Sequence, residues 1–406
     1  MGYMTKHAGM LLVVLVVGCG PEKRDIDTNP TPADIDAACP TTVSGKVFAP
    51  NGTLPLYAVT VYAPVSDPPP FTEGVQCGQC STGQPGGSTS STTSDATGSF
   101  TLDVPPGVNV PVIVTTGKWR RKVVIPFVAS CADNAQPDGT FRLPKNRSEG
   151  DMPRIAVVTG GCDPLACILP KLGIDPTEFG DSVTGANRVV FYGASGESPG
   201  APKASTVLWG SLDEMKKFDV IINSCECSEV NTNKTSPDLL RQYADLGGRV
   251  FGSHFHYTWT KNLIPVWAGQ ATWTSGSSTT PDLVDMSFPK GQALAQWLVA
   301  VGGSTTLGQI TLGTKTYNAS TVAATSQRWL YSSGVAPATS HYLSFDTPVN
   351  VPAAQQCGKV VFAGMHVSAG SVGSTFPAAC NATFSADEKA LAFLLFDLSS
   401  CVGTLF

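Results

Sequence analysis

The pattern of hydrophobic and polar positions changes near residue 149. Before that point, short stretches alternate between apolar and polar residues, a period of two that predicts half-buried β-strands. A segment rich in Pro, Gly, Ser and Thr, residues 66–94, is expected to be a loop among them. The pattern predicts an all-β region over residues 39–148, with strands at 43–48, 59–62, 98–105, 110–115 and 122–128.

From residue 149 onward, apolar runs alternate with helical segments. Helix signals are Ser236 before a proline and the capping box formed by Ser385 and Glu388. The alternation predicts a flavodoxin-like doubly wound parallel sheet over residues 149–406. Residues 303–356 break the alternation and are expected to be inserted β-hairpins. The apolar runs typical of strands buried on both faces are 154–159, 219–224, 249–253 and 358–364.

The N-terminal residues have the composition of a targeting segment. The apolar run 10–17 is shorter than the roughly 20 residues that cross a bilayer, which favours a signal peptide over residues 1–18. The sequence Val-Val-Gly-Cys ending at Cys19 resembles the bacterial lipobox, which implies cleavage before Cys19 and acylation of its thiol. Residues 19–38 would then form a lipidated, proline-containing tether.

This resemblance places the chain in the cell envelope, attached to the membrane through its N-terminal lipid. Gly20, rather than an aspartate, follows the lipidated position. In many Gram-negative species this implies sorting to the outer membrane. The expected location is therefore that of an outer membrane lipoprotein, facing the periplasm or the outside.

Charge and cysteine content narrow the class of protein. With 26 Lys and Arg against 31 Asp and Glu, the chain lacks the basic footprint of a nucleic-acid-binding protein. Twelve cysteines are present, and most should form disulfides in an oxidising compartment. The four between residues 39 and 148 can close two bridges, whereas the seven after residue 149 leave one thiol over. Cys77 and Cys80 are interpreted as structural, with Cys39 and Cys131 as candidate partners, rather than as a redox pair or half of a zinc site.

Three segments of the all-β region carry a family resemblance. They are Val-Ser-Gly-Lys-Val at 43–47, Val-Thr-Val-Tyr at 59–62 and Asp-Ala-Thr-Gly-Ser-Phe-Thr-Leu at 95–102. Together they resemble the carboxypeptidase regulatory-like, or transthyretin-like, β-sandwich. The resemblance implies a spacer or adhesive module rather than a catalytic one.

Polar groups with catalytic or metal-binding chemistry follow the predicted parallel strands, where open α/β sheets bind their ligands. His254 and His256 would point to one face if the strand before them continued, and His366 follows a later strand. These three histidines are the candidate metal ligands, and zinc is the candidate cofactor. A structural, hydrogen-bonded histidine pair is the alternative. The full set of candidate catalytic or ligand-binding residues is His254, His256, Glu226, His366, Asp163 and Cys225.

Cys225 has two further interpretations. It is a candidate nucleophile if His254 lies beside it on the neighbouring strand. A disulfide between Cys162 and Cys225 is the competing interpretation, because both follow strand ends in an oxidising compartment.

The segment from residue 239 to His254 resembles the class I glutamine amidotransferase-like fold, and most closely its trehalose-utilisation branch. In amidotransferases the turn after this strand carries a nucleophilic cysteine, and here His254 occupies that position. His366 matches the histidine that follows a late strand. Ser368 stands where the family has a glutamate, so the resemblance implies the fold without glutamine hydrolysis.

Two functions follow from these observations. The first is a membrane-anchored surface lipoprotein whose α/β domain, without glutaminase activity, binds a ligand or associates with the envelope. The alternative is an extracytoplasmic hydrolase, metal-dependent or carbohydrate-directed, that uses His254, His256, Glu226 and His366. A carbohydrate or small molecule is the expected ligand in either case. Aromatic residues that could stack on sugar rings are Tyr257, Trp259, Trp267, Trp273 and Trp297.

Overall fold

The computed structural model describes residues 39–403, except 82, 181–186, 197, 275–278, 317–318, 333–337, 368–372, 374 and 381–382. The expected signal peptide, the lipidation at Cys19 and the tether lie outside the described residues. Within the described part, no helix combines the length and apolar character needed to cross a membrane. The described residues from 40 onward form one compact unit.

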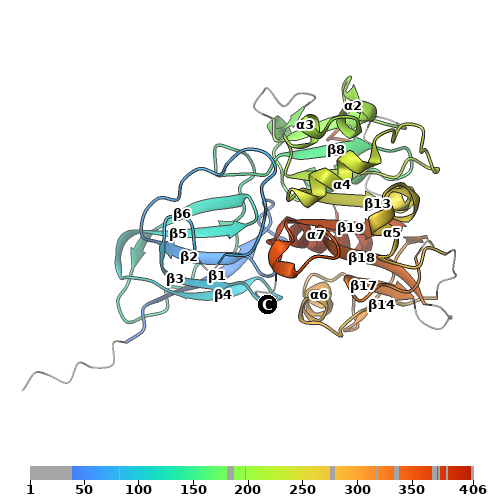
Figure 1. The fold of residues 1–406 in the computed structure, drawn as a ribbon. Helices are drawn as coiled ribbons and strands as arrows, with labels where there is room; N and C mark the ends of the chain where they lie inside the picture. The colour runs from blue at the N-terminus through green and yellow to red at the C-terminus, as the bar shows by residue number, and fades with distance from the viewer. Residues whose placement is uncertain are drawn as a thin grey trace, which may run out of the picture. The chain divides into compact units, whose positions relative to one another are not determined.

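The first part of this unit consists of two antiparallel-rich sheets (Figure 1). Inward-facing side chains such as Val47, Phe100 and Val112 are buried. The run Ser88–Thr93 forms a strand, although it lies in a segment expected to be a loop; it is polar on both faces and has no hydrophobic alternation to reveal it. The sheets are β4–β1–β7 (Ser99–Asp103, Thr42–Phe48, Phe141–Arg142) and β3–β2–β5–β6 (Ser88–Thr93, Thr60–Pro64, Gly107–Thr116, Trp119–Val128).

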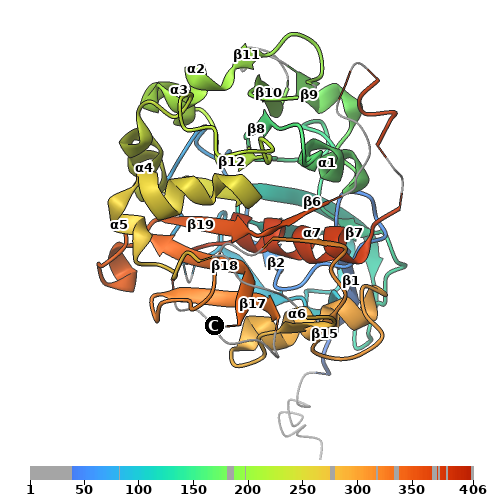
Figure 2. The ribbon, with the colours of Figure 1, turned by 90° about the vertical axis from the view of Figure 1, so that its right-hand side faces the viewer.

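The second part is built on an eleven-stranded sheet whose central strands are parallel. Numbered along the chain, the five central strands lie in the order 2-1-3-4-5, so the order reverses between β8 and β12. Figure 1 shows β8, β13, β19, β18 and β17 in this order across the sheet, and Figure 2 shows β10, β8, β12, β19, β18 and β17 in the same order. The central strands are β10 (Val189–Gly193), β8 (Ile155–Thr159), β12 (Val220–Asn223), β13 (Arg249–Ser253) and β19 (Gly358–Ala363), flanked by the short strands β11 (Lys203–Ala204) and β9 (Phe179–Gly180).

Beyond β19 the same sheet continues with antiparallel strands. Residues 303–356 supply most of them, and β17 and β18 pair with each other as a hairpin. A separate two-stranded ladder brings β16 against β20, close to the end of β19. The antiparallel strands are β18 (Thr339–Thr347), β17 (Ser326–Ser332), β14 (Asp282–Val284) and β15 (Gln309–Ile310), and the ladder pairs β16 (Thr314–Lys315) with β20 (Met365–His366).

Helices cover both faces of the sheet. The side chains of successive strand residues belong to two different hydrophobic cores, one on each face of the sheet, as those of Val250 and Phe251 do. Ser385 and Glu388 form the expected capping box at the start of α7. One core includes side chains of α2 (Ser205–Trp209), α3 (Leu212–Met215), α4 (Pro237–Asp245) and α5 (Pro265–Ala268). The other includes side chains of η1 (Leu165–Cys167), α1 (Ile168–Lys171), α6 (Pro289–Ala300) and α7 (Ala386–Ser399). The remaining short helices are η2 (Pro176–Glu178), η3 (His254–His256), η4 (Trp259–Leu263) and η5 (Ala353–Gln355).

The disulfides connect distant parts of the chain. Ten cysteines are disulfide-bonded, as an oxidising compartment predicts. Cys77 and Cys80 do not bond to cysteines of the first part, contrary to expectation: they bond to Cys357 and Cys401 near the end of the chain. Spacing along the sequence could not show this, because 280 and 321 positions separate the paired residues. Two more pairs lie within the second part, Cys162–Cys227 and Cys167–Cys380.

Candidate metal centre

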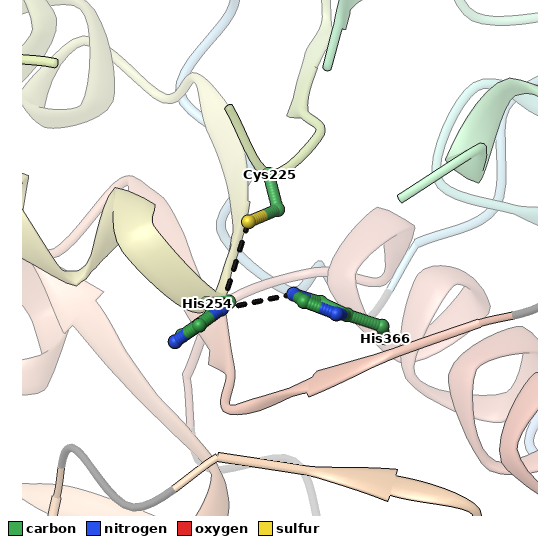
Figure 3. Close-up of side chains that lie close together, drawn as sticks. All are labelled: Cys225, His254 and His366. Atoms are coloured by element: carbon green, nitrogen blue, oxygen red, sulfur yellow. Dashed lines mark hydrogen bonds between the residues drawn. The ribbon is translucent and has the colours of Figure 1, made fainter. Parts of the chain in front are cut away.

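Three polar side chains from distant segments meet at the carboxyl ends of the parallel strands. The Cys225 sulfur lies 3.6 Å from Nδ1 of His254, and that nitrogen lies 2.9 Å from Nε2 of His366. Figure 3 shows the sulfur and the two rings brought together. One ligand atom from each residue fits within a group whose members all lie within 4.8 Å of one another. We refer to Cys225, His254 and His366 as the metal centre.

Cys225 follows β12 and lies at this edge of the sheet, where the segment after β12 packs closely against the segment after β8. The Ser224 N–H donates to the carbonyl of Val158, and the Cys162 N–H donates to the carbonyl of Cys225 at 3.2 Å. Gly160 lies directly against the carbonyls of Ser224 and Cys225, where any Cβ would collide. The glycine after β8 therefore allows the chain after β12 to approach closely. The Cys225 side chain is fully buried as a result.

His254 stands at a sharp turn of the backbone. β13 ends at Ser253, and His254 has a φ of +33°, a region that residues other than glycine rarely adopt. Such conformations persist where the surrounding structure enforces them, and they occur often at functional sites. The His254 ring also stacks on Phe255, with ring centroids 3.9 Å apart. The turn directs the imidazole of His254 toward Cys225.

The same turn separates the two histidines that sequence analysis placed on one strand face. A 3-10 helix, not a strand, carries His254 and His256. The Nε2–H of His256 donates to the Ser224 carbonyl at 2.8 Å, and its Nδ1 accepts from the indole N–H of Trp259 at 3.2 Å. Both ring nitrogens are thus engaged with the protein. His256 is a buried structural residue, not a member of the metal centre.

The carboxylate of Glu226 is engaged by other side chains and is not part of the metal centre. Its carboxylate forms a buried ion pair with Lys234 and accepts a hydrogen bond from the side-chain amide of Asn233 at 2.6 Å. The Lys234 ammonium lies 5.0 Å from the ring centre of Trp209. A carboxylate occupied by a buried lysine has little capacity to bind a metal ion or transfer a proton. The structure therefore corrects the expected grouping of Glu226 with the histidines.

Asp163 supports the centre without belonging to it. Its Oδ1 accepts a hydrogen bond at 3.1 Å from the N–H of Val367, the residue after His366. The ladder of β16 with β20 fixes the same segment from the other side, with Thr314 opposite His366. Asp163 therefore contacts the backbone that carries a candidate ligand.

Cys225 is the free cysteine of the described chain. The disulfide that sequence analysis considered between Cys162 and Cys225 is absent, because Cys162 bonds to Cys227 instead. This bridge joins the loop after β8 to the loop after β12, immediately beyond Cys225. It restricts the segment that presents the thiol.

Burial sets the charge state of the centre. It lowers the pKa of His254 to about 4, with a further contribution from the neighbouring His366, whose own pKa burial also lowers. Both rings are therefore neutral at neutral pH, which is the form that binds a metal ion. Burial raises the pKa of the Cys225 thiol, so the metal-free thiol is protonated and unsuited to act as a nucleophile.

The donor set fits zinc, and the two separations that involve His254 are close to those of a zinc site. Tetrahedral zinc with bonds of about 2.0–2.1 Å to nitrogen and about 2.3 Å to sulfur separates two nitrogens by about 3.3 Å, and a nitrogen from a sulfur by about 3.5 Å. The corresponding separations here are 2.9 Å between the nitrogens of His254 and His366, and 3.6 Å between the His254 nitrogen and the Cys225 sulfur. Small side-chain movements would complete a three-ligand site.

Most of the aromatic residues considered for sugar stacking belong to the core. Tyr257, Trp259, Trp267 and Trp297 are at most 4% exposed. Trp273 is only partly buried, and its ring packs on Tyr257 and Phe362. Ring stacking on a ligand at this surface is therefore limited to the exposed part of Trp273.

Sequence reasoning named the three members of the centre but missed residues around them. Phe255, which stacks on His254, was not among the candidates. Ser253 is a polar residue at the end of a buried strand, and this position was a signal for a role near the site. Tyr342 lies on β18, in the segment that broke the predicted alternation, and nothing local connects it with the site.

Comparison with known proteins does not extend this description. No protein-family model and no curated protein matches the sequence. Partial matches are found to chains from an N-terminal and a C-terminal interface mutant of a type II cohesin–X-dockerin complex of Acetivibrio cellulolyticus. They are 20% and 21% identical, each covering 36% of this chain and 78% of that chain, with TM-scores of 0.17 and 0.16. A likeness this slight carries no argument about fold or function.

Proposed function

We propose that this chain is an envelope lipoprotein whose α/β part is a zinc-dependent hydrolase with Cys225, His254 and His366 as metal ligands. One observation carries the proposal: ligand atoms from these residues gather within 4.8 Å of one another at the carboxyl edge of a parallel sheet. Three protein ligands leave a tetrahedral position open, as in catalytic zinc sites. Zinc bound there would lower the pKa of a water molecule to about 7.

The strand order supports the finer fold assignments that belong to this proposal. The order 2-1-3-4-5 is that of flavodoxin-like doubly wound sheets, in which ligands bind where the strand order reverses. The positions of His254 and His366 after β13 and the β19 segment agree with the proposed amidotransferase-like, trehalose-utilisation-type fold. We assign the first part to the transthyretin-like β-sandwiches, as a spacer between membrane and α/β domain.

The disulfides support an oxidising compartment for this function. Attachment through a lipid on Cys19 to the outer membrane is part of the proposal and rests on the lipobox-like sequence alone. Acyl chains of a lipoprotein would hold the hydrolase at the membrane surface, where small-molecule or carbohydrate ligands of the envelope are available.

Glutamine hydrolysis by a cysteine nucleophile is a weaker alternative. Position 254 holds histidine rather than cysteine, and the free thiol of Cys225 is fully buried with a raised pKa. A coordinated thiol, in contrast, loses its proton to the metal ion. The burial that disfavours a nucleophile is therefore compatible with a metal ligand.

A non-enzymatic role in ligand binding is the competing function. Here the same centre would bind a metal ion or small molecule without turnover. The half-buried histidines make the centre accessible in either case, and only activity separates the two functions.

Metal content is the first test. We expect one zinc per chain after expression with zinc, and loss of this zinc in Cys225→Ser, His254→Ala and His366→Ala. His256→Gln is the matched control, because it removes a neighbouring imidazole that the protein itself occupies, and it should retain zinc. Equal zinc in the wild type and in the triple ligand variant would overturn the metal centre.

Turnover is the second test. Ester, glycoside and glutamine substrates should be offered to the zinc-loaded and the chelator-treated protein. We expect hydrolysis of one class that requires zinc and disappears in His254→Ala. Stoichiometric zinc without turnover of any substrate would favour the binding role over the hydrolase.

A further inference from the structure

Two polar residues, Ser253 and Tyr342, lie on either side of Ala363 on adjacent strands near the metal centre. The register places Ser253 of β13 opposite Ala363 of β19, and Ala363 opposite Tyr342 of β18. Residues in direct register point to the same face of a sheet, here the face whose core includes side chains of α1 and α7. The small side chain of Ala363 leaves room between the serine and the tyrosine.

The carboxyl group of Asp163 approaches these residues from the loop after β8. Asp163 is 1% exposed. Burial raises the pKa of Asp163 to about 7, and the nearby Ser253 hydroxyl partly offsets this rise. The Ser253 oxygen itself is buried without a hydrogen-bond partner in the described part. The second carboxylate oxygen of Asp163 and the hydroxyl of Tyr342 are likewise buried without a hydrogen-bond partner there.

Unpartnered buried polar atoms cost free energy, so their presence together calls for an explanation. Asp163 is linked to all three segments that carry the metal ligands. It accepts from Val367, next to His366, and lies by Ser253, next to His254. Cys162, the residue before Asp163, donates its N–H to the Cys225 carbonyl at 3.2 Å.

We propose that Asp163 is the positioning residue of the metal centre, whose negative charge and contacts hold the three ligand-bearing segments in place for a divalent cation. The inference rests on the proposed function, because it requires that the centre binds metal. Residues behind metal ligands orient them, and their substitution typically weakens metal affinity by about 10- to 100-fold. The charge of Asp163 would attract the cation, and its contact with Val367 would fix His366.

The expected effect is measured by titrating the full chain with Zn²⁺ and Co²⁺. Asp163→Asn preserves an acceptor for the Val367 N–H but removes the charge, and we expect Zn²⁺ affinity to fall by about 10- to 100-fold. The visible absorption of the Co²⁺-substituted protein should shift, because the ligand geometry changes. Ser253→Ala should weaken binding to a smaller extent.

Asp219→Asn is the matched control. Asp219 is also a largely buried carboxyl group, with a side chain 12% exposed, and it accepts from the Arg154 N–H at 2.7 Å where β8 and β12 begin, at the opposite end of these strands from the metal centre. Its substitution should leave both metal affinity and the Co²⁺ spectrum unchanged. A merely structural Asp163 would behave like this control.

The outcomes separate the two proposals. A wild-type chain that binds neither Zn²⁺ nor Co²⁺ would remove the metal centre and this inference with it. A wild-type chain that binds zinc, with Asp163→Asn binding equally well and giving the same Co²⁺ spectrum, would leave the metal centre standing and overturn only the role of Asp163. Circular dichroism of each variant shows whether it is folded.

Discussion

Nδ1 of His254 and Nε2 of His366 lie 2.9 Å apart, although 112 positions separate the two residues in the sequence. Two neutral imidazoles at this distance place one proton between their facing nitrogens, since one nitrogen must donate and the other accept. A metal ion that binds both nitrogens takes the place of this proton. The proton can then move to the other nitrogen of the same ring, so the imidazole pair binds metal without releasing a net proton.

Zinc affinity should therefore depend on pH through the thiol. Burial lowers the pKa of His254 to about 4 and also lowers that of His366, so both imidazoles are already neutral at neutral pH. Burial raises the pKa of Cys225, so its proton must be displaced at any neutral pH. We expect affinity to rise about tenfold per pH unit between about pH 6 and 8, with one proton released per zinc. Competition with a chelator of known affinity measures this slope.

Cys225→Ser is the control for this dependence. The variant should bind zinc weakly and without the slope, because the hydroxyl does not ionise in this range. A wild-type affinity that stays constant over the same range would show that the thiol is not a ligand.

Asp163 should have opposite effects on stability and metal binding. Burial raises its pKa to about 7, above the ordinary value of 3.8 that applies to the unfolded chain. The folded state thus binds more protons between these values, and its stability is greatest below about pH 4 and declines as the pH rises through about 7. In the metal-free protein, Asp163→Asn should abolish this decline and raise the free energy of unfolding at pH 8 by about 2–4 kcal/mol.

Urea unfolding with chelator present, at about pH 5 and pH 8, measures the effect. Asp213→Asn provides an exposed control that should leave the pH dependence unchanged. A variant less stable than the wild type at pH 8 would mean that the carboxylate has partners that offset its burial.

The sequence predicts individual strands and helices better than it predicts which residues of different elements come into contact. The runs at 249–253 and 358–364 were expected as buried strands because each is largely apolar, and the helix after Ser385 was expected because its cap is local. The turn at His254 was not expected: an alternating histidine pair has the same spacing in a strand as in the turn that the backbone takes here. Local patterns do not encode φ at a single residue.

The sequence also did not reveal contacts between residues far apart in the chain. The partner of Cys77 lies 280 positions away, and the position of Tyr342 beside Ala363 depends on the register of β18 with β19. No local sequence pattern indicates either of these contacts. Glu226 shows the same limit, since nothing at its position reveals that Lys234 will occupy its carboxylate.

The two classes of disulfide should have different consequences. Cys77→Ser combined with Cys357→Ser opens a bridge between distant segments and should lower the stability of the protein by roughly 2–5 kcal/mol while zinc affinity stays the same. Cys162→Ser combined with Cys227→Ser releases the loop that presents Cys225 and should weaken zinc binding as well. Thermal unfolding and zinc titration of both double variants provide the comparison. Equal zinc affinity in the two would show that the Cys162–Cys227 bridge does not position the thiol.

The pair of Glu226 and Lys234 should prove structural. Both side chains are buried, with exposed fractions of 2% and 1%, so removing one charge leaves the other without compensation. Lys234→Met should therefore destabilise the protein by about 3–5 kcal/mol, and Glu226→Gln in the same chain should recover most of this loss. Zinc content and any hydrolytic activity should be unchanged in the double variant, because neither residue belongs to the metal centre. Loss of activity in Glu226→Gln with its stability intact would instead restore Glu226 to the catalytic group that its sequence position first suggested.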